Sequence, residues 1–78
     1  MADSMREILI KASVSHFQGH IDKHIANVEN YFRNSVGVGE HPDVMEAIES
    51  EIAQIADYQD KLDILNKYFI ESGSSDPS

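Results

Sequence analysis

Hydrophobic side chains recur at helical spacing in two long segments. In each segment, two seven-residue series alternate at steps of three and four, which is the spacing of one apolar stripe along a helix. The first stripe consists of Ile10, Val14, Phe17, Ile21, His24, Val28 and Tyr31. The second contains Ile48, Ile55, Leu62 and Phe69, flanked by Met45, Ile52, Tyr58 and Leu65. The pattern predicts an all-α protein with helices at about residues 4–34 and 43–71.

The segment between the stripes carries residues that end helices. Two glycines permit positive φ, and a proline cannot continue a helix through its own nitrogen but suits a first helical turn. Asp43 and Glu46 have the spacing of a capping box, so we expect the second helix to begin near residue 43. The same segment is a candidate docking loop, because loops carry recognition. Its key residues are Gly37, Gly39, His41, Pro42 and Asp43.

The first helix has a start signal, but its middle contains residues that weaken a helix. Ser4 and Glu7 have capping spacing, while Ser13, Ser15 and Gly19 have weak helix propensity. The stripe runs through this stretch in phase, which favours one unbroken helix, and a three-helix arrangement broken near residues 13–19 stays the alternative. Residues 72–78 contain no hydrophobic side chain, so we expect a single domain over 1–71 and a disordered tail over 72–78.

Folding the chain near residue 38 brings the two stripes together as an antiparallel hairpin. The predicted pairs are Val28 with Ile48, Ile21 with Ile55, Val14 with Leu62, Phe17 with Tyr58, and Ile10 with Leu65. Two helices sharing one seam bury too little for a chain of this size, and several hydrophobic residues lie off the stripe. We therefore expect a dimer of hairpins that forms a four-helix bundle. The predicted core and oligomer residues are Ile10, Val14, Phe17, Ile21, Val28, Ile48, Ile52, Ile55, Leu62, Leu65 and Phe69.

Composition narrows the function classes. The 78 residues include no cysteine, so disulfides and zinc-thiolate sites are excluded. No apolar run approaches the ~20 residues that span a bilayer, and the N-terminal residues lack a secretory signal pattern, so we expect a cytoplasmic protein. The net charge is −8 and arises entirely after residue 34, which argues against direct nucleic-acid binding. It leaves open an acidic inhibitor that imitates nucleic acid and occupies a basic host protein.

Three histidines, His16, His20 and His24, lie four residues apart on one helical face. Imidazoles at this spacing can chelate a divalent transition metal, with Glu51 or Asp57 as a further ligand from the opposite helix. A histidine-based metal-binding bundle is therefore an alternative, although ordinary surface histidines explain the same pattern and we expect no resident metal or cofactor.

His24 occupies a stripe position, where a polar group needs a partner or water. The antiparallel register places Glu51 opposite it, which predicts a hydrogen bond that fixes register, with a partly exposed histidine as the alternative. No nucleophile and base are paired in the sequence, and we expect no catalytic residue and no enzymatic activity.

Part of the sequence resembles small uncharacterised proteins of contractile-tailed bacteriophages of marine cyanobacteria. The resemblance rests on residues 27–34, 36–43, 46–49, 60–62 and 68–69. It implies a phage-encoded accessory protein in the host cytoplasm, and it implies no activity and no functional residue. Together with the stripes, it favours a non-catalytic helical interaction module. Such a module forms a homo-oligomer and can bind a further, unidentified protein partner.

Overall fold

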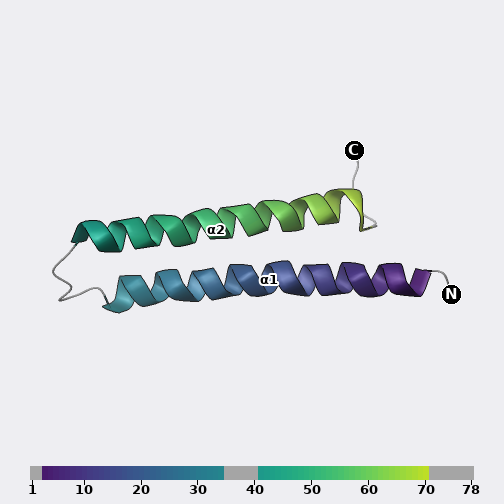
Figure 1. Ribbon diagram of the computed structural model, residues 1–78, viewed down its shortest axis with the longest axis horizontal. Helices are drawn as coiled ribbons and strands as arrows, with labels where there is room; N and C mark the ends of the chain where they lie inside the picture. Colours follow the sequence, from purple (N-terminus) through teal and green to yellow (C-terminus); the bar gives the residue numbers. More distant parts are fainter. Residues whose placement is uncertain (1–2, 35–40, 71–78) are drawn as a thin grey trace.

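The computed structural model describes residues 3–34 and 41–70 and contains two helices and no strand over these ranges. Helix α1 spans Asp3–Asn34 and helix α2 spans His41–Tyr68. The helices run antiparallel and side by side, so the start of α1 and the end of α2 lie at the same end of the hairpin (Figure 1). The predicted all-α hairpin is confirmed. Gly37, Gly39 and the tail at 72–78 lie outside the described residues.

Helix α1 runs unbroken through the weak stretch at residues 13–19. Ser13 is accommodated because its hydroxyl donates to the carbonyl oxygen of Leu9 at 2.8 Å. Gly19 is exposed, and a Cβ built there would meet nothing within 4 Å, so no packing contact requires a glycine at this position. The single long helix is thus confirmed over the broken alternative.

Helix α2 differs from the expected bounds by a few residues at each end. It begins at His41, two residues before the predicted start, so Asp43 lies inside the first turn. A negative charge in the first turn is favoured by the helix dipole. The helix ends at Tyr68, although the amide of Phe69 still donates to the Leu65 carbonyl oxygen at 2.9 Å.

The core is a single seam between the two helices. Among the described residues, only Ile21, Val28, Ile48 and Leu62 are buried, with exposed fractions of 3% to 8%. All four belong to the predicted core. The partly exposed seam residues among the predicted set are Ile10, Val14, Phe17, Ile55 and Leu65.

Two predicted core residues lie outside this seam. Ile52 is 49% exposed and Phe69 is 52% exposed. Ile52 lies one turn beyond the buried Ile48, on the flank of the stripe, where a single partner helix does not reach. Phe69 follows the last residue of α2. Each of the two residues keeps about half of its surface exposed in the single chain.

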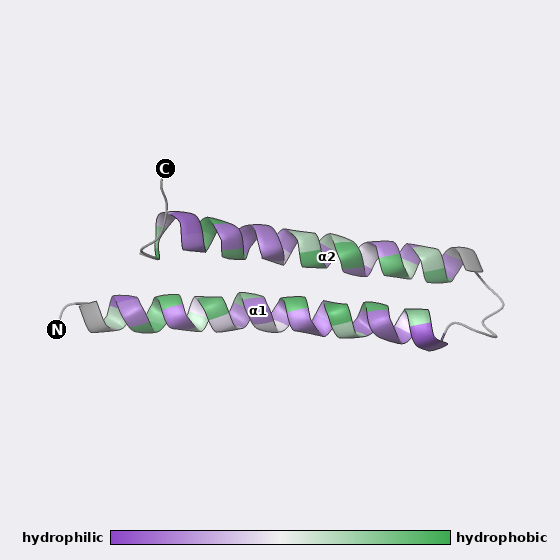
Figure 2. Cartoon of the chain, turned by 180° about the vertical axis from the view of Figure 1, so that it is seen from behind, coloured by the Kyte–Doolittle hydropathy of each residue, from purple (hydrophilic) through white to green (hydrophobic). Residues whose placement is uncertain are grey.

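Large hydrophobic side chains also line the outer surfaces of the hairpin. Green, hydrophobic stretches alternate with purple, hydrophilic ones along both helices in Figure 2. The exposed large hydrophobic residues are Met5, Ile8, Leu9, Ile25, Phe32, Met45, Ile52, Ile64, Tyr68 and Phe69. Within the described ranges, neither helix has an apolar stretch of the length that a bilayer crossing requires.

Candidate functional site

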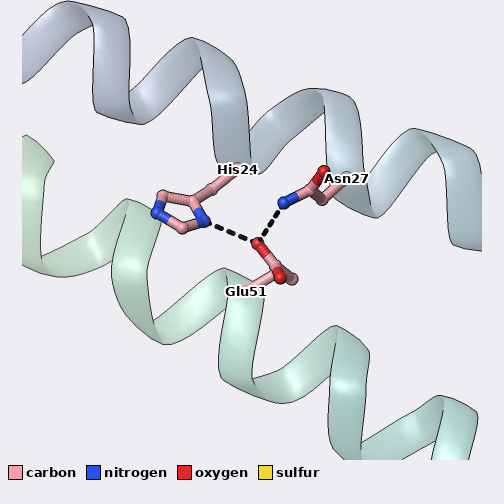
Figure 3. A network of polar contacts seen from close by, with 3 residues as sticks. All are labelled: His24, Asn27 and Glu51. Carbon is pink, nitrogen blue, oxygen red and sulfur yellow. Dashed lines mark hydrogen bonds and ion pairs between the residues drawn. The ribbon is translucent and has the colours of Figure 1, made fainter.

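A polar network crosses the seam near its middle. One carboxylate oxygen of Glu51, Oε1, lies 2.6 Å from Nδ1 of His24 and accepts a hydrogen bond from Nδ2 of Asn27 at 3.0 Å (Figure 3). The side chains of His24 and Glu51 are only 12% and 21% exposed. The predicted His24–Glu51 bond is confirmed. Since a carboxylate only accepts, Nδ1 of His24 carries the proton in this bond.

Asn27 is the member of the network that sequence reasoning missed. It follows His24 by three residues, so both side chains lie on the face of α1 that meets α2. The amide of Asn27 and the ring of His24, in that order, hold the pKa of Glu51 below its usual value through their hydrogen bonds. The ionised form of Glu51 therefore stabilises the hairpin.

An aromatic stack continues from this network toward the start of α1. The ring of Tyr58 lies 4.3 Å from the ring of His20, and the two planes are within 5° of parallel. Phe17, which was predicted to lie near Tyr58, has its ring centroid 6.2 Å away. The ammonium of Lys61 stands 5.0 Å from the centroid of the same tyrosine ring. Tyr58 thus joins residues of both helices.

His20 is held in an apolar contact that disfavours its charge. Its Nδ1 is buried and has no hydrogen-bond partner. Burial lowers the pKa of His20 below its usual 6.5, and the neighbouring charges of His16, Lys23 and His24 lower it further. A neutral imidazole stacked on Tyr58 is the form that fits this position.

The three histidines do not converge on one point as metal ligands would. His16 and His20 meet edge to face, with ring centroids 4.7 Å apart, while His20 and His24 are stacked at 6.2 Å. The carboxylates considered as further ligands are engaged elsewhere, Glu51 with His24 and Asp57 with Lys61. Within residues 3–34 and 41–70, no group of three or more histidine, aspartate or glutamate side chains is placed to hold a metal ion.

The predicted docking loop is described only in part. Asp43 is exposed in the first turn of α2. His41 and Pro42 belong to the same turn, and the glycines lie outside the described residues. No protein-family model, curated protein or solved structure matches this chain. The surfaces that remain as functional candidates are the polar network, the histidine–tyrosine stack and the exposed apolar side chains.

The variant Glu51→Gln should reduce the loss of folding stability that the wild type shows as the pH falls below about 5. Because the folded-state pKa of Glu51 lies below its ordinary value of 4.5, its contribution is present above that pH and is lost as the pH falls toward the folded value. Urea unfolding midpoints measured from neutral pH downward should show the wild type more stable than the variant, with a gap that narrows below about pH 5. Asp60→Asn removes an exposed carboxylate of the same helix and serves as the control. A gap that stays constant with pH would contradict the role of Glu51.

The variant His20→Phe should weaken the pH dependence near neutrality. A folded-state pKa below 6.5 means that the unfolded chain takes up a proton first, so stability falls as the pH drops through 6.5. Phenylalanine keeps the stack on Tyr58 but cannot be protonated. Between about pH 7.5 and 5.5, the unfolding midpoint should fall less for this variant than for the wild type. Equal slopes in the two proteins would refute the assignment.

Proposed function

We propose that this chain is a non-catalytic protein-interaction module that self-associates through its exposed hydrophobic side chains. The simplest assembly is a dimer in which two hairpins form a four-helix bundle. The observation that carries the proposal is a contrast within residues 3–34 and 41–70: four seam residues are buried, while ten large hydrophobic residues are exposed in the single chain. Monomeric proteins rarely expose contiguous apolar surface on this scale.

A second hairpin of the same chain can bury these exposed hydrophobic residues. In a four-helix bundle each helix contacts two neighbours, so residues that flank the stripe become core residues. Ile52 is such a residue: it lies beside the seam, it is exposed in the single chain, and it continues the apolar face of α2. A covering helix supplied by another copy would bury it without any change in the hairpin.

The polar network supports a structural rather than a catalytic role. Glu51 receives hydrogen bonds from both of its partners across the seam, and its ionised form is favoured. A buried polar contact of this kind sets the register of packed helices, because any slip leaves its members unpaired. The network therefore fixes the shape of the surface that the module presents to its partner.

Light scattering after gel filtration tests the proposal. Across a dilution series, with helicity recorded on each sample, the wild-type chain should have the mass of a dimer or larger and should lose helix as it dissociates. Ile21→Asp places a charge at a seam residue that is 3% exposed, so it should abolish both helix and assembly. Ala26→Asp places the same charge on the exposed face of α1 and should keep both. A wild-type chain that stays a helical monomer at every concentration would contradict the proposal.

A further inference from the structure

Seven of the ten large hydrophobic residues that are exposed in the described ranges belong to two patches with different surroundings. The acid-rimmed patch lies in the half of the hairpin where the helices are joined and consists of Ile25, Phe32, Met45 and Ile52. The base-rimmed patch lies at the open end of the hairpin and consists of the exposed Met5, Leu9 and Phe69 together with the partly exposed Leu65. Met5 and Leu9 belong to α1 and Leu65 belongs to α2, so the patch bridges the start of α1 and the end of α2.

Carboxylates surround the acid-rimmed patch. On α2, Met45 and Ile52 flank the buried Ile48, and the three side chains line a shallow hollow of about 370 Å³ together with Glu46 and Glu49. The hollow is therefore apolar at its floor and negative at its edge.

The α1 part of the acid-rimmed patch has the same character. Ile25 and Phe32 each follow a buried seam residue by four positions, as Ile52 does on α2. In an antiparallel pair of helices, positions with the same offset from facing seam residues lie on the same side of the seam. Asp22 and Glu29 lie three and four residues from Ile25, so carboxylates border this side as well. Of these two, Glu29 is paired with Arg33 at 3.5 Å.

One cation lines the base-rimmed patch, and two more line the hollow beside it. Its residues line a hollow of about 490 Å³, and Arg6 forms part of the wall. Arg6 also borders an adjoining hollow of about 750 Å³, whose other charged side chains are Lys11, Lys67 and one carboxylate, that of Glu7. Three of the six lysines and arginines in the chain thus meet at one end of the hairpin.

The two halves of the hairpin differ in charge as a whole. Residues 20–34 and 41–56, the joined half, hold six acids against two bases. Residues 3–19 and 57–70, the open half, hold five acids against four bases. The joined half is therefore strongly negative, while the open half is close to neutral and carries its cations beside exposed hydrophobic residues.

We propose that the acid-rimmed patch of one chain binds the base-rimmed patch of a second copy, so that neighbouring hairpins are turned end for end. This inference rests on the proposed self-association and specifies its contact. Each patch can cover the hydrophobic side chains of the other. The carboxylates at the rim of one patch would lie close to the cation at the rim of the other. Contact between two acid-rimmed patches would instead bring like charges together around a desolvated surface.

The two patches lie on opposite sides of the seam, which determines how the assembly grows. Arg6 and Ser13 of the base-rimmed hollow share one seven-residue series with His20 and Asn27, on the side of the polar network. The acid-rimmed patch lies on the other flank. One chain can therefore use both patches at once. When an acid-rimmed patch binds a base-rimmed patch, the resulting dimer still has one unoccupied patch of each kind. The pair thus grows by adding further copies as the concentration rises.

A mixing experiment tests the inference. Ile52→Glu disrupts only the acid-rimmed patch and Leu9→Glu only the base-rimmed patch, and glutamate keeps good helix propensity at these exposed positions. Each variant alone should assemble at least tenfold more weakly than the wild type. An equimolar mixture should form a one-to-one dimer, because one variant keeps the patch that the other has lost, and it should grow no further. Ala53→Glu, on the exposed outer face of α2, is the control and should assemble like the wild type.

The possible failures are distinguishable by mass and helicity. In one failure, Leu9→Glu still forms dimers, Ile52→Glu does not, and mixing the two produces no new species. Acid-rimmed patches would then bind each other. The inference would be wrong, while the proposed self-association would stand. If the wild type is monomeric at every concentration, the proposed function fails as well. Recovery of mass and helicity in the mixture also shows that both variant chains can fold.

Salt provides a test that needs no variant. A contact between oppositely charged rims should weaken several-fold between about 50 and 500 mM sodium chloride, because salt screens the attraction. A contact between two acidic rims should strengthen over the same range, because salt screens a repulsion. Stronger wild-type assembly at high salt would therefore overturn the inference.

Discussion

The single seam between α1 and α2 is the constraint on which the rest of the structure depends. Two packed helices touch along one line, so each can bury only a narrow stripe of side chains. Here that stripe yields four buried residues, at positions 21, 28, 48 and 62. The hydrophobic residues beside the stripe have no place inside the hairpin, which is why its outer surface carries them. In the proposed assembly a further copy covers them.

A seam this thin needs a device that selects one register. A seven-residue slip would bring seam positions back into phase, so hydrophobic contacts alone discriminate weakly between registers. Such a slip would move His24 opposite Val44 or Tyr58 and leave the carboxylate of Glu51 without its partners. Because unpaired polar groups in a packed seam are costly, the network of His24, Asn27 and Glu51 opposes the slip. Register in turn determines which hydrophobic and charged residues share a face.

Much of this arrangement could be predicted, because the seven-residue spacing of hydrophobic positions indicates both where the helices lie and which of their residues face each other. The same arithmetic that pairs the stripes places Glu51 opposite His24, and the structure contains that bond. Spacing alone could not foresee the stack of His20 on Tyr58, since it depends on side-chain rotamers at the flank of the seam. It also could not separate core residues from oligomer residues, and Ile52 was predicted as one or the other. Periodicity shows that a position is hydrophobic, but it does not show how many helices are present to cover that position.

The central claim is that one seam is insufficient and that assembly completes the fold. The dependence of the thermal unfolding midpoint on protein concentration tests this most directly, because a folded state that contains several copies is stabilised by mass action. Over a roughly hundredfold range of concentration, the account predicts a midpoint that rises steadily with concentration. A midpoint that does not change over that range would show that the hairpin of α1 and α2 folds alone, and it would contradict the account.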